Sequence, residues 1–129
     1  MADPKYLLVA EGDQFLRELY VEILVSAGFR VDQAPDGELC YNLMKKGGFD
    51  LVLLDTKLPK LDSVSILKKL SQETPPETPN KIIILLSNFS REPEITKSIE
   101  LGAKDYLIKS DLTPEQILNE VKRHLFASS

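Results

Sequence analysis

Short apolar runs alternate with segments of helical periodicity along the chain, and this alternation limits the possible folds more than any other feature. The apolar runs are 6–10, 29–34, 50–55, 81–87 and 104–109. The helical patterns that follow them are 15–27, 36–48, 64–70, 93–102 and 113–125. Strands that alternate with helices form parallel sheets, because a crossover must return the chain to the same edge. The sequence therefore predicts an α/β fold, with a doubly wound parallel sheet covered by helices on both faces.

Several predicted elements carry recognisable end signals. Asp13 precedes the first helix as a candidate N-cap, and Gly28 ends that helix. The last helix begins with Thr113, Pro114 and Gln116, the pattern of a capping box. The segment QETPPETPN, residues 72–80, contains three prolines, which exclude regular structure and predict an exposed connector.

The composition indicates a folded protein of 129 residues, and we expect a single domain over 1–129. A net charge of −4 argues against a direct nucleic-acid partner, because phosphate backbones need basic surfaces. The apolar runs are too short to cross a membrane, so no membrane partner is expected. The one cysteine, Cys40, is predicted to be a core residue in a reducing, cytoplasmic protein, and the one histidine, His124, to be a surface residue.

Polar side chains stand where four of the five apolar runs end. Glu11 follows the first run, Asp55 ends the third, Ser87 ends the fourth and Lys109 ends the fifth. The carboxyl ends of parallel strands lie at one edge of the sheet, where such folds bind their ligands. A carboxylate nucleophile with a hydroxyl and an ammonium group nearby is suited to phosphoryl transfer.

These same stretches resemble the receiver domain of response regulators, the CheY-like family, over essentially the whole chain. The similar segments are LLVAEGDQFLREL, FDLVLLDTKLPKLD, IILLSNF and GAKDYLIKSD. The resemblance implies a five-stranded sheet in the order 2-1-3-4-5 with five helices. It also implies that Asp55 is the phosphoacceptor, that Ser87 and Lys109 assist at the site, and that Ser87 and Tyr106 form a switch pair.

The resemblance further implies partners and a cofactor for two-component phosphorelay signalling. The phosphoryl donor would be a histidine kinase or a phosphotransfer protein. Mg²⁺ would be held by Glu11, Asp55 and the backbone carbonyl of Lys57. The output would be an unidentified downstream protein bound by the face that comprises the helix 93–102, the strand 104–109 and the helix 113–125. Such a domain is not an enzyme beyond its own phosphorylation and dephosphorylation at Asp55.

The sequence departs from the family pattern at three places. The family has two adjacent acids after the first strand, but here Glu11 is followed by Gly12, so we expect weakened Mg²⁺ binding. Ser110 stands where the family has proline, and this predicts a trans peptide bond after Lys109. The variable positions hold Lys57 and Phe89, and the Lys57 ammonium could replace part of the missing metal charge.

Two functions from different classes remain open at this level. The first is a receiver that is phosphorylated on Asp55 with weakened Mg²⁺ binding. The second is a pseudo-receiver that acts as a protein-interaction module without phosphorylation. A phosphatase of the haloacid dehalogenase type would need an acid at Lys57, and a flavodoxin-like flavin carrier would need a Ser/Thr/Gly phosphate loop in place of AEGDQ, so both are weaker interpretations.

Overall fold

A five-stranded parallel sheet forms the centre of the computed structural model, which describes residues 3–127. The strands lie in the order β2-β1-β3-β4-β5, and each neighbouring pair is parallel. Their bounds are β1 (Tyr6–Ala10), β2 (Arg30–Ala34), β3 (Leu51–Asp55), β4 (Ile82–Ser87) and β5 (Asp105–Ile108). This confirms the predicted fold class and strand order.

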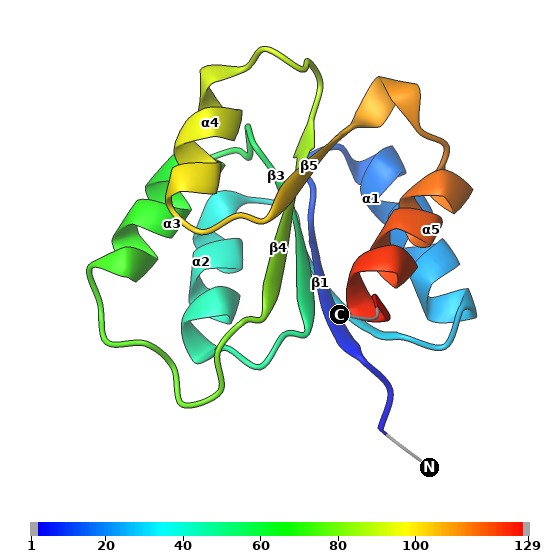
Figure 1. The fold of residues 1–129 in the computed structure, drawn as a ribbon, viewed down its shortest axis with the longest axis horizontal. Helices are drawn as coiled ribbons and strands as arrows, with labels where there is room; N and C mark the ends of the chain where they lie inside the picture. Colours follow the sequence, from blue (N-terminus) through cyan, green and yellow to red (C-terminus); the bar gives the residue numbers. More distant parts are fainter. Residues whose placement is uncertain (1–2, 128–129) are drawn as a thin grey trace.

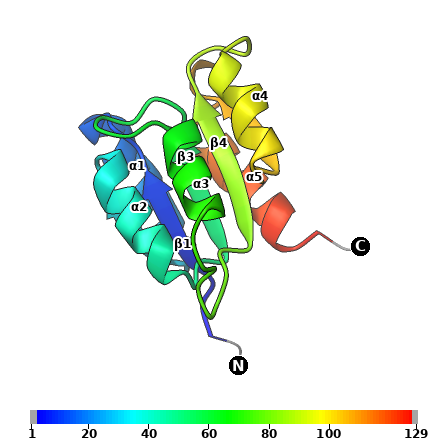
Figure 2. The same ribbon diagram turned by 90° about the vertical axis from the view of Figure 1, so that its left-hand side faces the viewer.

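Helices cover both faces of the sheet (Figures 1 and 2). Their bounds are α1 (Gln14–Ser26), α2 (Gly37–Lys46), α3 (Ser63–Ser71), α4 (Pro93–Glu100) and α5 (Pro114–Leu125). Helices α2, α3 and α4 lie on one face, and α1 and α5 pack together on the other. In residues 3–127 we find no helix long and apolar enough to span a membrane.

The predicted helix ends are confirmed by side-chain hydrogen bonds. Asp13 Oδ1 accepts from the Leu16 amide at 2.9 Å, and Thr113 and Gln116 form the predicted capping box. The last strand is shorter than predicted, because a 3₁₀ turn, η1 (Lys109–Asp111), begins directly after Ile108. No cis peptide bond occurs in residues 3–127, as Ser110 predicted for the bond after Lys109.

Alternate residues of the inner strands point to opposite faces of the sheet and build two separate cores. Leu8, Val52 and Leu54 belong to the cluster beneath α2, α3 and α4. Leu7 and Leu53 belong to the cluster beneath α1 and α5. Because β1 and β3 are apolar on both faces, the acids Glu11 and Asp55 stand where these two strands end.

Gly37 allows the start of α2 to touch the loop that follows β3. A Cβ atom at this position would lie 1.9 Å from the carbonyl oxygen of Leu61. The Gly37 amide also donates to the Pro59 carbonyl at 2.8 Å. Lys60, which lies between Pro59 and Leu61, has a positive φ of 72°. This contact fixes the path of the chain just beyond Asp55.

Three expectations about exposed and buried residues had different outcomes. The segment 72–80 is an exposed connector as predicted, and the Gly48 amide anchors it through a 2.8 Å bond to the Thr78 carbonyl. The prediction of a surface His124 is wrong, because its side chain is only 8% exposed and Nε2 lies 2.8 Å from Asp105 Oδ2. The polar sequence around α5 concealed this contact, since Asp105 is distant along the chain. Cys40 lies in the core as predicted, and burial raises the pKa of its thiol to about 12.

Candidate functional site

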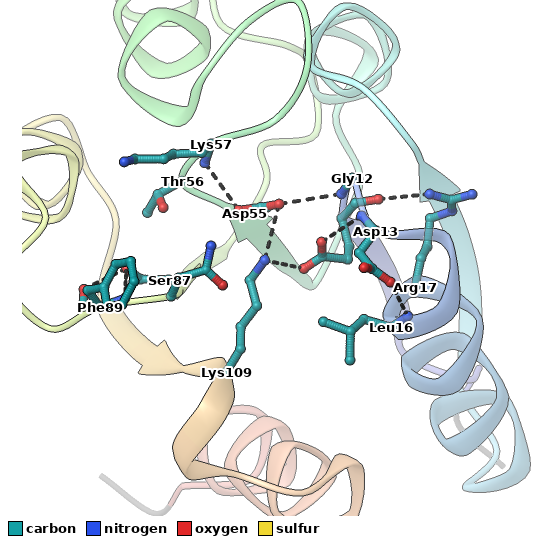
Figure 3. Close-up of polar contacts among 12 residues, drawn as sticks. Gly12, Asp13, Leu16, Arg17, Asp55, Thr56, Lys57, Ser87, Phe89 and Lys109 are labelled. Carbon is teal, nitrogen blue, oxygen red and sulfur yellow. Dashed lines mark hydrogen bonds and ion pairs between the residues drawn. The ribbon is translucent and has the colours of Figure 1, made fainter.

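The predicted polar residues meet at the carboxyl edge of the sheet (Figure 3). Glu11 follows β1, Asp55 ends β3, Ser87 ends β4 and Lys109 follows β5. Glu11, Asp55 and Ser87 are all buried. The parallel arrangement therefore gathers two carboxylates, a hydroxyl and an ammonium group, as the sequence predicted.

Lys109 joins the two carboxylates. Its Nζ lies 2.7 Å from Glu11 Oε1 and 3.2 Å from Asp55 Oδ2 (Figure 3). The Lys109 side chain is only 8% exposed, so solvent screens these contacts weakly. One ammonium group therefore offsets part of the negative charge of the two acids.

Backbone amides hold the carboxylates in place. The Lys57 amide donates to Asp55 Oδ1 at 3.1 Å, and the Gly12 amide makes a longer contact of 3.4 Å to Asp55 Oδ2. The Asp13 amide donates to Glu11 Oε2 at 2.9 Å. Arg17, from α1, fixes the same turn through a 2.9 Å hydrogen bond to the Glu11 carbonyl. Backbone amides of the loops that follow β1 and β3 thus orient both carboxylates.

The buried negative charge alters the acidity of its neighbours. Burial, and next the charge of Asp55, raise the pKa of Glu11 above its ordinary value, although Lys109 acts in the opposite direction. Burial also raises the pKa of Tyr20 to about 12, with contributions from Glu11 and Asp55. The site therefore keeps an excess of negative character in spite of the Lys109 ammonium.

Gly12 occupies a position where the backbone does not require glycine. The residues with positive φ in the described chain do not include Gly12. A Cβ built there would lie 3.8 Å from Asp55 Oδ2 and 3.0 Å from Pro59 Cδ. A side chain at this position would start close to Asp55 and would require a shift of Pro59.

The donor set for a divalent cation is small. Within residues 3–127 no cluster of three or more acidic, histidine or cysteine side chains has the geometry of a metal site. Asp13 does not take the place of the missing acid, because its side chain caps α1. Glu11 and Asp55 remain, and buried Glu11 Oε1 has only the Lys109 ammonium beside it. These two carboxylates are the side chains that could hold Mg²⁺ here, and Lys109 already contacts both of them.

The side chains of three predicted residues, Ser87, Lys57 and Tyr106, lie in different surroundings. Ser87 Oγ donates to the Phe89 carbonyl at 2.8 Å, so its hydroxyl is directed into the loop after β4. The Lys57 side chain extends away from the carboxylates (Figure 3). Lys57 therefore contributes its backbone amide, and no ion pair to its ammonium is found among the described residues. Tyr106 is half-exposed on β5.

Sequence reasoning missed one buried acid near this edge. Glu92, just before α4, is 6% exposed and accepts a 2.7 Å hydrogen bond from Thr56 Oγ1. In the sequence it resembles the other acids of a polar loop. Pro93 beside it marks a helix start, but that signal gives no partner for the carboxylate.

Comparison with known proteins gives the family directly. Residues 7–122 match the family described as the response regulator receiver domain. This chain belongs to that family. The DltR transcriptional regulatory protein of Streptococcus agalactiae serotype III is 38% identical over 103 residues, which are 80% of this chain and 44% of that protein. The receiver domain therefore spans less than half of that relative.

Solved receiver domains share the fold. The CheY-like receiver domain protein of Methanospirillum hungatei has a TM-score of 0.81 at 23% identity and covers 95% of this chain and 94% of its own. The receiver domain of the Pseudomonas aeruginosa sensor histidine kinase PA1611 has a TM-score of 0.79 at 22% identity, with 95% and 98% covered. That structure holds a magnesium ion in its active site cleft.

Membership places this chain among the receiver domains of two-component systems. Such domains exchange signals with histidine kinases or phosphotransfer proteins and are signalling domains rather than enzymes of metabolism. The edge that carries Glu11, Asp55, Ser87 and Lys109 is then the candidate phosphoacceptor site of this receiver domain.

Proposed function

We propose that this receiver domain accepts a phosphoryl group on Asp55 from a histidine kinase or phosphotransfer protein. The position of Asp55 carries the proposal, because its carboxylate is fixed at the end of β3 with the Lys109 ammonium 3.2 Å from Oδ2. An oxygen of Asp55 forms a bond to phosphorus as the bond between phosphorus and the donor nitrogen breaks. The departing imidazole takes the electron pair, and an acyl phosphate remains on Asp55. Lys109 offsets the charge on the transferred oxygens.

Glu11, Asp55 and the backbone carbonyl of Lys57 would hold Mg²⁺ at this site. Bound there, the ion supplies positive charge beside the phosphoryl oxygens. We expect it to bind weakly, since Gly12 provides no carboxylate and Lys109 already lies between Glu11 and Asp55. Weak metal binding makes phosphorylation of Asp55 slow.

The same two features support a second candidate, a pseudo-receiver that binds a partner protein without phosphorylation. In that case the ion pairs of Lys109 with Glu11 and Asp55 are permanent, and the site serves as a charged structural centre. The two candidates differ in one measurable property, the reactivity of Asp55.

Labelling with acetyl phosphate in the presence and absence of Mg²⁺ tests the proposal. Intact-protein mass spectrometry should show a single added phosphoryl group on the parent, formed slowly and faster with Mg²⁺. Asp55→Asn is the blank and should add none. If the parent remains unlabelled at high Mg²⁺ while Gly12→Asp is labelled, the pseudo-receiver function replaces the proposal.

We further propose that the face of α4, β5 and α5 carries the signal to a downstream protein. Ile99 and Tyr106 support this, because both are large apolar side chains exposed on that face, at 41% and 38%. Phosphorylation of Asp55 should shift the amide resonances of α4 and β5, through Ser87 and Tyr106. Tyr106→Ala should remove the shifts on β5 while Asp55 is still labelled. Unchanged shifts in that variant would assign Tyr106 a packing role only.

A further inference from the structure

Glu92 is a buried carboxylate that the proposed phosphoryl chemistry does not use. It stands at the N-cap position of α4, yet its side chain makes no capping hydrogen bond to that helix. Only 6% of the residue is exposed. A buried acid is costly unless its oxygens find donors, so the partners of Glu92 define its role.

Those partners lie directly after β3 and in the loop after β4. Thr56 Oγ1 donates to Glu92 Oε2 at 2.7 Å, and the Asn88 amide makes a longer contact of 3.3 Å to Oε1. Thr56 is itself 1% exposed and directly follows Asp55. The carboxylate of Glu92 thus connects the residue beside the phosphoacceptor with the start of α4.

The charge state of Glu92 agrees with this geometry. Burial is the largest influence and would raise its pKa, but the hydroxyl groups of Thr56 and Ser87, the nearby Lys57 charge and the Asn88 amide together outweigh it and leave the pKa lowered. Glu92 is therefore ionised at neutral pH. An ionised acceptor makes a stronger hydrogen bond than a neutral one.

The loop 88–92 is held at its other end as well. Ser87 Oγ donates to the Phe89 carbonyl at 2.8 Å and receives a longer contact from the Phe89 amide at 3.3 Å. In this position the loop presents Phe89 with 69% of its surface exposed. The loop therefore has side-chain hydrogen bonds at both ends.

We propose that Glu92 is a positioning residue, and that its hydrogen bond with Thr56 fixes the loop 88–92 and the start of α4 against the end of β3. An internal carboxylate thus contributes to the position of this loop. The proposal goes beyond phosphoryl transfer and does not require Asp55 to be phosphorylated.

A second buried contact of α4 supplies a matched control. Ser63 Oγ and Ser98 Oγ lie 2.7 Å apart and connect α3 with α4. Both serines are fully buried. Removal of this contact also costs α4 a buried hydrogen bond, but it leaves the loop 88–92 untouched.

Amide hydrogen exchange, followed by NMR on the full chain, tests the proposal. The reporters are the amides of Asn88, Phe89 and Ile95, which all have acceptors in or beside the loop. Thr56→Val removes the hydroxyl and keeps the shape, and Thr56→Ser keeps the hydroxyl. We expect exchange at these three amides to rise tenfold or more in Thr56→Val, relative to the slowest core amides, and to stay near the parent rate in Thr56→Ser.

Two further variants complete the design. Ser98→Ala should lower overall stability without a selective increase at the three reporters. Glu92→Gln should raise their exchange, and the Thr56→Val, Glu92→Gln double variant should exceed the larger single effect by no more than twofold, since both changes remove the same contact. If Thr56→Val leaves the reporters within twofold of the parent, or if Ser98→Ala raises them equally, the Thr56–Glu92 contact is ordinary packing and the proposal is overturned.

Discussion

The Lys109 ammonium lies between Glu11 and Asp55, 2.7 Å from one carboxylate and 3.2 Å from the other. All three side chains are largely buried, so both carboxylates depend on the Lys109 ammonium for stabilisation, whereas the two carboxylates repel each other. The position of Lys109 also decides how attractive the site is to a cation. The first two predictions both make the site more negative, one by adding an acid and the other by removing the ammonium group.

Replacement of Gly12 by aspartate should raise the affinity for Mg²⁺ by tenfold or more. The new Cβ would lie 3.8 Å from Asp55 Oδ2, so a third carboxylate would join Glu11 and Asp55. Mg²⁺ selects hard oxygen donors and gains from each added negative charge. Isothermal titration calorimetry of the parent and the variant measures the change directly.

Gly12→Asn is the control for this prediction, because it adds nearly the same volume without the charge. The contact with Pro59 Cδ, 3.0 Å from the new Cβ, is common to both variants. Equal affinities for the aspartate and asparagine variants would show that charge at this position does not limit metal binding.

Replacement of Lys109 by methionine should make stability decrease as the pH rises above about 4.5, the ordinary value for Glu11. The pKa of Glu11 is already raised, by burial and by Asp55, and Lys109 opposes the rise. Without the ammonium it should rise further, so the folded protein binds a proton that the unfolded chain releases. Urea unfolding between pH 4.5 and 8 should show the decline, and a flat profile would contradict it.

Gly37→Ala should lower the free energy of unfolding by about 2–4 kcal/mol, as overpacking against a rigid neighbour does at its more severe end. The added methyl group would lie 1.9 Å from the Leu61 carbonyl oxygen, and backbone must move to make room. Gly48→Ala is the control, because Gly48 has a φ of 92° but no atom within 4 Å of a new Cβ. That change should cost about 1–2 kcal/mol through backbone strain alone. Similar losses in chemical denaturation would argue against the steric explanation.

Glu92→Gln should flatten the dependence of stability on pH below 4.5, the ordinary value for this acid. The pKa of Glu92 is lowered in the fold, so its contribution is present above the unfolded value and lost as the pH falls through the folded one. Lys57 is the charged neighbour that shares in this shift. Chemical unfolding at successive pH values gives the free energy of unfolding as a function of pH. Below pH 4.5 this free energy should fall more steeply for the parent than for the variant, and equal slopes would exclude Glu92 as a contributor.

Much of the fold was predictable because local and long-range signals agree. Apolar runs buried on both faces gave the strands, and Asp13 and Thr113 gave helix starts that the hydrogen bonds confirm. His124 was misplaced for the opposite reason. Its environment depends on Asp105, which lies 19 residues away along the chain. No periodicity within α5 carries that information.

The sequence by itself determined which chemistry reaches the edge of the sheet. The alternation of strands and helices predicts parallel strands, and parallel strands all end at the same edge of the sheet. The sequence therefore predicts that Glu11, Asp55, Ser87 and Lys109 converge there. The tertiary structure alone decided how those groups pair. Lys109 bridges two carboxylates, Ser87 turns into its own loop, and Glu92 reaches back to Thr56. The parallel direction of the strands follows from the alternation along the chain, and their order was implied by the family resemblance. A side-chain hydrogen bond instead depends on distances of a few ångströms between residues that only packing brings together.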